Sequence, residues 1–86
     1  MQTISLVLRG EESTQMKHIA LMIQKASTYR SSIYVMVGDR RANAKSLLGM
    51  MSLGVTPGEE IHIQAEGPDE EMAANELAAW LEDLQA

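Results

Sequence analysis

Few side chains in this chain could do chemistry near neutral pH, and two of them are the histidines His18 and His62. A neutral imidazole can accept a proton or a phosphoryl group through a ring nitrogen with a free lone pair. The spacing of the two histidines does not make a metal site, so neither a metal nor a cofactor is expected. The chain has no cysteine, which excludes disulfides and zinc–thiolate sites and is typical of a reducing compartment.

Ser46 is the serine whose position suggests a role. It lies at the start of a short apolar segment, Lys45 to Leu53, which is followed by Gly54. Serine is favoured at a helix N-cap, where its oxygen accepts from a free backbone amide, and glycine is favoured just beyond the helix end. On spacing alone, Ser46 is therefore a structural cap. Gly49 costs a helix about 1 kcal/mol relative to Ala, which predicts a brief helix held by its surroundings.

The elements that must position these residues follow from hydrophobic periodicity. Alternation between Thr3 and Leu8 predicts a half-buried strand. Between Thr14 and Ser27, apolar residues recur at three- and four-residue steps and predict an amphipathic helix, with Ser13 or Thr14 as its N-cap. The apolar positions of this helix are Met16, Ile19, Ala20, Ile23 and Ala26.

Two further strands, Ser32 to Val37 and Arg40 to Asn43, flank Gly38-Asp39, a pair suited to a type II′ hairpin turn. Pro57-Gly58 marks another turn. A last strand, Glu60 to Glu66, places His62 outward. Asp69 is a good N-cap for the final helix, with Glu70 and Glu71 in a first turn whose dipole favours anions. The stripe predicted to be buried on that helix consists of Ala73, Leu77, Trp80, Leu81 and Leu84.

The order of these elements predicts an α+β fold. It is a two-layer, open-faced β-sandwich with a four-stranded antiparallel sheet, and the two long helices and the short one cover one face. Eighty-six residues are enough for one domain, expected over 1–86.

Charge and hydropathy exclude several classes of function. The net charge is −5, with Glu11-Glu12, Glu59-Glu60 and the last twenty residues rich in acid, so binding of nucleic acid is not expected. No stretch approaches the roughly 18 apolar residues that span a membrane, and no secretory signal is visible at the start. A cytoplasmic protein is the expectation.

The segment Asn43 to Val55, NAKSLLGMMSLGV, closely resembles the central segment of HPr, the histidine-containing phosphocarrier of the bacterial sugar phosphotransferase system. The resemblance is greatest to the HPr proteins of Gram-positive bacteria. The element order is the same, and Ala65 to Glu71, AEGPDEE, is similar to the family's run into its last helix. This resemblance covers nearly the whole chain and implies the HPr fold and a protein that is not an enzyme.

The start of the first helix departs from the family. HPr proteins have a Gly-Leu-His-x-Arg-Pro-Ala motif there, whose His carries the phosphoryl group. Counted back from Lys45-Ser46, the carrier position is Gln15, the Arg position is Lys17 and the Pro position is His18. A carboxamide cannot accept a phosphoryl group as an imidazole does, and lysine lacks the fork of arginine. The resemblance therefore implies that carrier function through Gln15 is lost. The catabolite-repression homologues of HPr also have Gln there and keep the regulatory Ser.

The resemblance further implies that Ser46 is the residue phosphorylated by the ATP-dependent HPr kinase/phosphorylase, with Lys45 close enough to screen the phosphate. The family uses the positions of Leu47, Leu48 and Met51 to dock partners; on the sequence alone, these side chains could equally pack in the core. The expected partner surface consists of Gln15, Lys17, Lys45, Leu47, Leu48 and Met51. The expected partners are the kinase and a catabolite-control regulator of the LacI type.

Three alternatives stay open at this stage. His18, one turn beyond the carrier position, could carry phosphate itself, although a solvated helix histidine is the simpler explanation and the one we favour. The chain could also be a plain interaction domain with no phosphorylation. It could finally be a decayed paralogue without a role.

Overall fold

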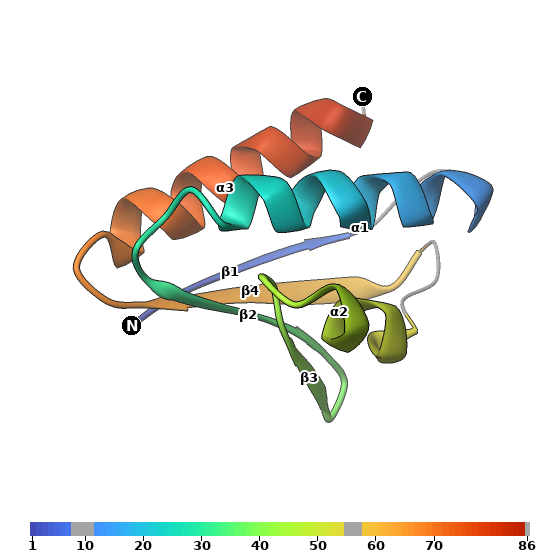
Figure 1. Ribbon diagram of the computed structural model, residues 1–86, viewed down its shortest axis with the longest axis horizontal. Coiled ribbons are helices and arrows are strands. Elements are labelled where there is room, and N and C mark those ends of the chain that lie inside the picture. Colours follow the sequence, from blue (N-terminus) through green and yellow to red (C-terminus); the bar gives the residue numbers. More distant parts are fainter. Residues whose placement is uncertain (8–11, 55–57, 86) are drawn as a thin grey trace.

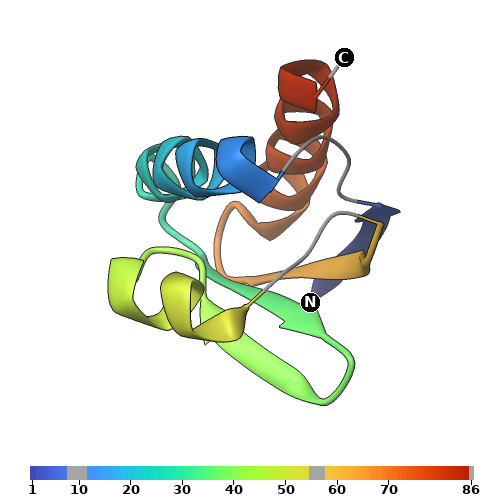
Figure 2. The ribbon, with the colours of Figure 1, turned by 90° about the vertical axis from the view of Figure 1, so that its right-hand side faces the viewer.

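The computed structural model describes residues 1–7, 12–54 and 58–85, and for residues 12–16 and 85 it describes the backbone alone. Its elements are β1 (Gln2–Val7), α1 (Glu12–Ala26), β2 (Ser32–Val37), β3 (Arg40–Asn43), α2 (Leu47–Leu53), β4 (Glu60–Glu66) and α3 (Glu70–Gln85). The strands form one antiparallel sheet in the order β1-β4-β2-β3. Figures 1 and 2 show α1 and α3 over one face of the sheet and α2 on the same side beside β3. The predicted α+β open-faced sandwich is confirmed.

The core lies between the sheet and the helices. Alternate residues of β2 and β4 point into it, and the register sets Ile63 of β4 between Ile4 of β1 and Val35 of β2. From α3, Leu77 and Leu81 are fully buried, whereas Trp80 and Leu84 pack only partly against the core. The stripe predicted for this helix is therefore present. Four alanines on the long helices are also buried, and their small side chains suit the close packing of α1 on α3: Ala26, Ala73, Ala74 and Ala78.

The first long helix, α1, differs from its prediction at its start and at one position of its buried face. It begins at Glu12, so Ser13 and Thr14 lie inside its first turn, and the prediction that either is the N-cap was wrong. An acidic residue in the first turn is favoured by the helix dipole, which allows the helix to start earlier. Ala20 was also placed wrongly on the buried face. The side chain of Ala20 is exposed, while Met22 is buried three residues after Ile19 and takes its place.

The connections follow the predicted turn chemistry where the structure describes them. Val37 pairs with Arg40, so Gly38-Asp39 forms a two-residue hairpin. Gly38 has a positive φ of 60° and Asp39 does not, which is the pattern of a type II′ turn. Leu8 and Pro57, which the sequence placed in a strand and a turn, lie outside the described residues.

The start of α3 is bonded to the loop before β2 through Asp69. Its backbone carbonyl accepts from Ala73 N at 2.8 Å, as an N-cap does, but its carboxylate reaches away from the helix. That carboxylate accepts from the backbone amides of Arg30 at 2.9 Å and Ser31 at 2.8 Å, and also from the Ser31 hydroxyl. These bonds, first the one from Ser31 Oγ and then the one from the Arg30 amide, lower the pKa of Asp69 to about 2. We call this cluster of Arg30, Ser31 and Asp69 the Asp69 tie.

Gly67 allows this close approach. A Cβ built on Gly67 would lie 2.8 Å from the Ser31 Cα, closer than van der Waals contact permits, and the φ of Gly67 is 149°. Both facts require glycine at this position. Ser31, although buried, is satisfied by the carboxylate beside it.

Candidate functional site

The cap of α2 is as the sequence predicts. Ser46 has an extended backbone, and its Oγ accepts from Gly49 N at 3.2 Å. Its carbonyl accepts from Met50 N at 3.0 Å, which begins the helix. At the other end, Gly54 is the C-cap in the left-handed conformation, with φ 67°. Ser46 is half-buried, so the residue lies at the edge of the core and not within it.

Gly49 lies close to the cap residue. A Cβ at Gly49 would lie 3.3 Å from Ser46 Oγ and 3.5 Å from Ser46 Cβ, so the Ser46 side chain would have to shift slightly to admit it. Glycine at this position carries a helix-propensity cost of about 1 kcal/mol relative to alanine.

Lys45 holds the start of α2 against the loop after α1. Its Nζ donates to the backbone carbonyl of Tyr29 at 2.8 Å, and its backbone amide donates to Asn43 Oδ1 at 2.8 Å. The Tyr29 hydroxyl in turn donates to Glu76 of α3 at 2.9 Å. Burial, followed by this bond, raises the pKa of Tyr29 to about 12. The ammonium expected to screen a phosphate on Ser46 is thus bonded to the Tyr29 carbonyl.

One face of α2 is apolar and open to solvent. Leu47, Leu48 and Met51 are 54%, 77% and 48% exposed, whereas Met50 and Leu53 on the other face are buried. The alternative that Leu47, Leu48 and Met51 pack in the core is therefore wrong, since α2 is too short to bury more than one face. These three are half of the six large apolar side chains that the described residues expose. We call Leu47, Leu48 and Met51 the α2 patch.

The first helix is a neighbour of α2 on the helical side of the sheet (Figure 2). It packs against α2, and Figure 2 shows the two helices next to each other on one side of the sheet. Gln15 belongs to the beginning of α1, and its side chain is outside the described set. Lys17 is exposed. The structure thus packs α1, the helix that carries Gln15 and Lys17, against α2, while Lys45 bonds the start of α2 to the loop after α1.

Neither histidine side chain is fully exposed to solvent. His18 is half-buried, and its Nδ1 is buried without a hydrogen-bond partner among the described residues, so only Nε2 could approach a donor protein. His62 lies on the outer face of the sheet, as predicted, but with two partners that the sequence did not reveal. Its Nδ1 is 2.6 Å from Ser5 Oγ on β1, and its Nε2 is 3.3 Å from Glu60 Oε1. This arrangement joins two strands.

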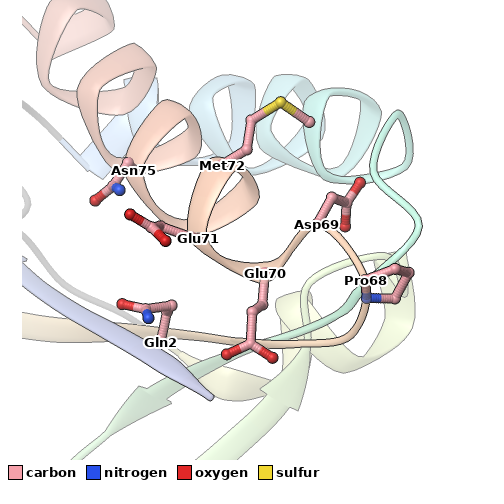
Figure 3. A pocket seen from close by; sticks show the side chains of 7 residues that line it. All are labelled: Gln2, Pro68, Asp69, Glu70, Glu71, Met72 and Asn75. Carbon is pink, nitrogen blue, oxygen red and sulfur yellow. The ribbon is translucent and has the colours of Figure 1, made fainter.

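Two hollows were not foreseen. The larger, about 770 Å³, lies between β1 and the first turn of α3, where Figure 3 shows Glu71 and Asn75 near Gln2. The smaller, about 320 Å³, lies between β3 and α2, lined by two arginines, Arg40 and Arg41. Arg40 Nη1 donates to the Leu53 carbonyl at 2.6 Å, and the Arg41 guanidinium stacks 3.8 Å from the centre of the Tyr34 ring.

The part of the chain that the structure describes contains no cluster of three acidic or histidine ligands suited to a metal ion. Among the described helices, none has the length and apolar content that crossing a membrane requires.

Comparison with known proteins gives consistent results. A family model described as "PTS HPr component phosphorylation site" matches residues 3–83. The HPr-like protein Crh of Bacillus subtilis is 34% identical over 76 residues, covering 88% of this chain and 89% of that protein. The Crh of Halalkalibacterium halodurans is 37% identical over 68 residues, covering 79% and 81%. The crystal structure of HPr-C-His from Thermoanaerobacter tengcongensis superposes with a TM-score of 0.88 at 35% identity, over 95% and 92% of the two chains.

Proposed function

Because the chain belongs to the HPr family, we propose that it is a regulatory protein of the phosphotransferase system that partners recognise through α2, and not a phosphohistidine carrier. One observation carries the proposal: the α2 patch is exposed directly beside Ser46, while the family's carrier position is Gln15. Its relatives at 34% and 37% identity are themselves called HPr-like proteins.

Loss of phosphate carriage follows from the chemistry at the start of α1. The amide nitrogen of Gln15 has its lone pair delocalised into the carbonyl, so it does not attack a phosphoryl donor. Lys17 offers a point charge where a guanidinium would hold two phosphate oxygens at once. His18 is a poor substitute for the missing group, since its Nδ1 is buried and only Nε2 is left to approach a donor.

Ser46 is the proposed site of regulation. Phosphorylation by an ATP-dependent HPr kinase/phosphorylase would add a charge of about −2 within one helical turn of the α2 patch. The free amides and the dipole of α2 favour an anion at this end, so the helix keeps its place when modified. The new charge would change which partner surface can dock on the patch, which is how a local modification becomes a switch.

The proposed partners are the kinase itself and a catabolite-control regulator of the LacI type, in the cytoplasm. The apolar patch would form the centre of the contact, and Lys17 and phosphorylated Ser46 its charged rim. With lysine in place of arginine, we expect the contact with the regulator to be weaker than in relatives that keep the arginine fork.

The test is phosphorylation with ATP and HPr kinase, followed by mass spectrometry of the fragments. The proposal predicts one phosphate, on Ser46, absent from Ser46→Ala. Ser52→Ala is the matched control, because Ser52 is an exposed serine on the same short helix. A phosphate on Ser52, or none at all with a kinase that modifies an authentic HPr in parallel, would contradict the proposal.

A second candidate is an interaction domain without phosphorylation. The exposure of the α2 patch favours it, because apolar docking does not require a phosphate. Binding to a partner that depends on Leu48 but is the same for wild type and Ser46→Ala, with no phosphate on Ser46, would establish this reading.

A further inference from the structure

We propose that Met51 is an oxidation-sensitive site, and that conversion of its thioether to the sulfoxide weakens docking on the α2 patch. The inference rests on the proposed function, since it concerns the same surface. It assigns a chemical modification to a residue whose role in that surface is otherwise only to supply apolar area.

The reaction needs one co-reactant, a peroxide such as hydrogen peroxide. A lone pair on Sδ attacks one peroxide oxygen, the S–O bond forms as the O–O bond breaks, and a proton shift releases water. Sulfur is oxidised by two electrons and the peroxide is reduced by two. The product, methionine sulfoxide, is polar where the thioether was apolar, and methionine sulfoxide reductases reverse it.

Exposure directs the oxidant to few methionines. Met22 and Met50 are 3% and 2% exposed, so their sulfur atoms are shielded by the core. Met51 and Met72 are exposed to almost the same extent, 48% and 49%, and Met1 to 65%. The chain has no cysteine to compete for the oxidant. Met51 is therefore one of the accessible targets, and among the methionines whose side chains the structure describes it is the one within the α2 patch.

The position of Met51 on α2 determines how its oxidation affects docking. Met51 lies four residues after Leu47 and three after Leu48, so the three side chains share one face of α2. An interface that buries this face would have to bury the sulfoxide oxygen, which is unfavourable unless the partner offers it a donor. In the free protein the oxygen would stay in water, so folding is unaffected. Met72 is equally exposed but lies on α3, beside the larger hollow and off the α2 patch.

The experiment compares wild type, Met51→Leu and Met72→Leu, each before and after hydrogen peroxide, with HPr kinase as the probe. Affinity is measured by calorimetry, and peptide mass spectrometry records which methionine carries oxygen. We expect oxidation to weaken binding about tenfold in wild type and in Met72→Leu, and to leave the ratio near one in Met51→Leu. Methionine sulfoxide reductase should restore the wild-type affinity.

The outcomes separate the two proposals. If untreated wild type binds the kinase and oxidised wild type, with oxygen on Met51, binds equally well, the inference about Met51 is overturned and the proposed function stands. An equal loss in Met51→Leu would also overturn the inference. If untreated wild type does not bind, the proposed function fails and the inference fails with it. Circular dichroism of each oxidised sample checks that the fold is kept.

Discussion

The N-termini of α2 and α3 both carry a residue that favours helix caps, yet the two side chains do opposite things. Ser46 Oγ bonds to Gly49 of its own helix, three residues away, and the residue remains half-buried. Asp69 instead directs its carboxylate to Arg30 and Ser31, which lie 39 and 38 residues away along the chain. One cap is local, whereas the other joins two distant segments.

This difference indicates which of the two helix N-termini can be modified while the fold is kept. A change at Ser46 disturbs one short helix whose other anchors, the buried Met50 and Leu53, remain. A change in the Asp69 tie disturbs the loop that sets the direction of β2, a central strand of the sheet. A change at Ser46 should therefore cost the fold less stability than a change that breaks the close approach at the Asp69 tie.

Gly67→Ala should be the most damaging of these changes. The added Cβ would meet the Ser31 backbone at 2.8 Å, and the φ of 149° is strained for any other residue. We expect a loss of about 3 kcal/mol in the free energy of unfolding, measured by urea denaturation. Gly38→Ala is the control, because its φ is also positive but nothing lies within 4 Å of the new Cβ. It should cost about 1 kcal/mol, and equal losses in both variants would contradict a role for the close approach.

Leu48→Ser should weaken docking and leave stability unchanged. The side chain is 77% exposed, so removing it opens no cavity in the folded protein, but it would remove apolar contact from the centre of an interface. We expect roughly a tenfold loss of affinity for HPr kinase, about 1.4 kcal/mol, by calorimetry. Met72→Ser, which removes a side chain that is 49% exposed elsewhere, should bind as wild type does. A similar loss in both would show that the α2 patch is not the docking surface.

Ser46→Ala should cost about 1 kcal/mol in unfolding free energy, because the Gly49 amide loses its acceptor. Ser46→Asp should recover most of it, since aspartate caps as well as serine and suits the dipole. Thermal unfolding of both variants, with Ser52→Ala as the surface control, measures this. If Ser46→Asp were much less stable than Ser46→Ala, this helix end would not tolerate the charge that the proposal places there.

The Asp69 tie should also make the stability of the protein depend on pH. The folded pKa of Asp69 is lowered from 3.8 to about 2, so the carboxylate contributes stability that is present above pH 3.8 and is lost as the pH falls towards 2. Asp69→Asn removes that contribution. The difference in melting temperature between wild type and Asp69→Asn should therefore be constant near neutrality and shrink below pH 3.8. A difference that stays constant down to pH 2 would show that the carboxylate charge does not stabilise the Asp69 tie.

The sequence predicted what is encoded locally. Four features depend on residues within a few positions of one another: the order of strands and helices, the type II′ turn, the N-cap at Ser46 and the C-cap at Gly54. The contacts that it missed are non-local. Lys45 on the Tyr29 carbonyl and His62 beside Ser5 depend on how distant segments meet, and no local pattern specifies that. Ala20 was misplaced because alanine is apolar but small enough to sit exposed on a helix at little cost.

The candidate site shows the same division. The family pattern located Ser46 and the α2 patch, but only the fold showed that Leu47, Leu48 and Met51 share the exposed face while Met50 turns inward. The residues that hold α2 in place, above all Lys45, became evident from their bonds.

The most direct test of the account is incubation with phosphoenolpyruvate and the first enzyme of the phosphotransferase system, beside an HPr that has its histidine. Phosphate on histidine is labile to acid, so it is distinguishable from phosphate on serine. We predict that the control becomes labelled and that this chain gains no acid-labile phosphate. Acid-labile labelling of this chain that is lost in His18→Ala would contradict the central claim that it has ceased to be a carrier.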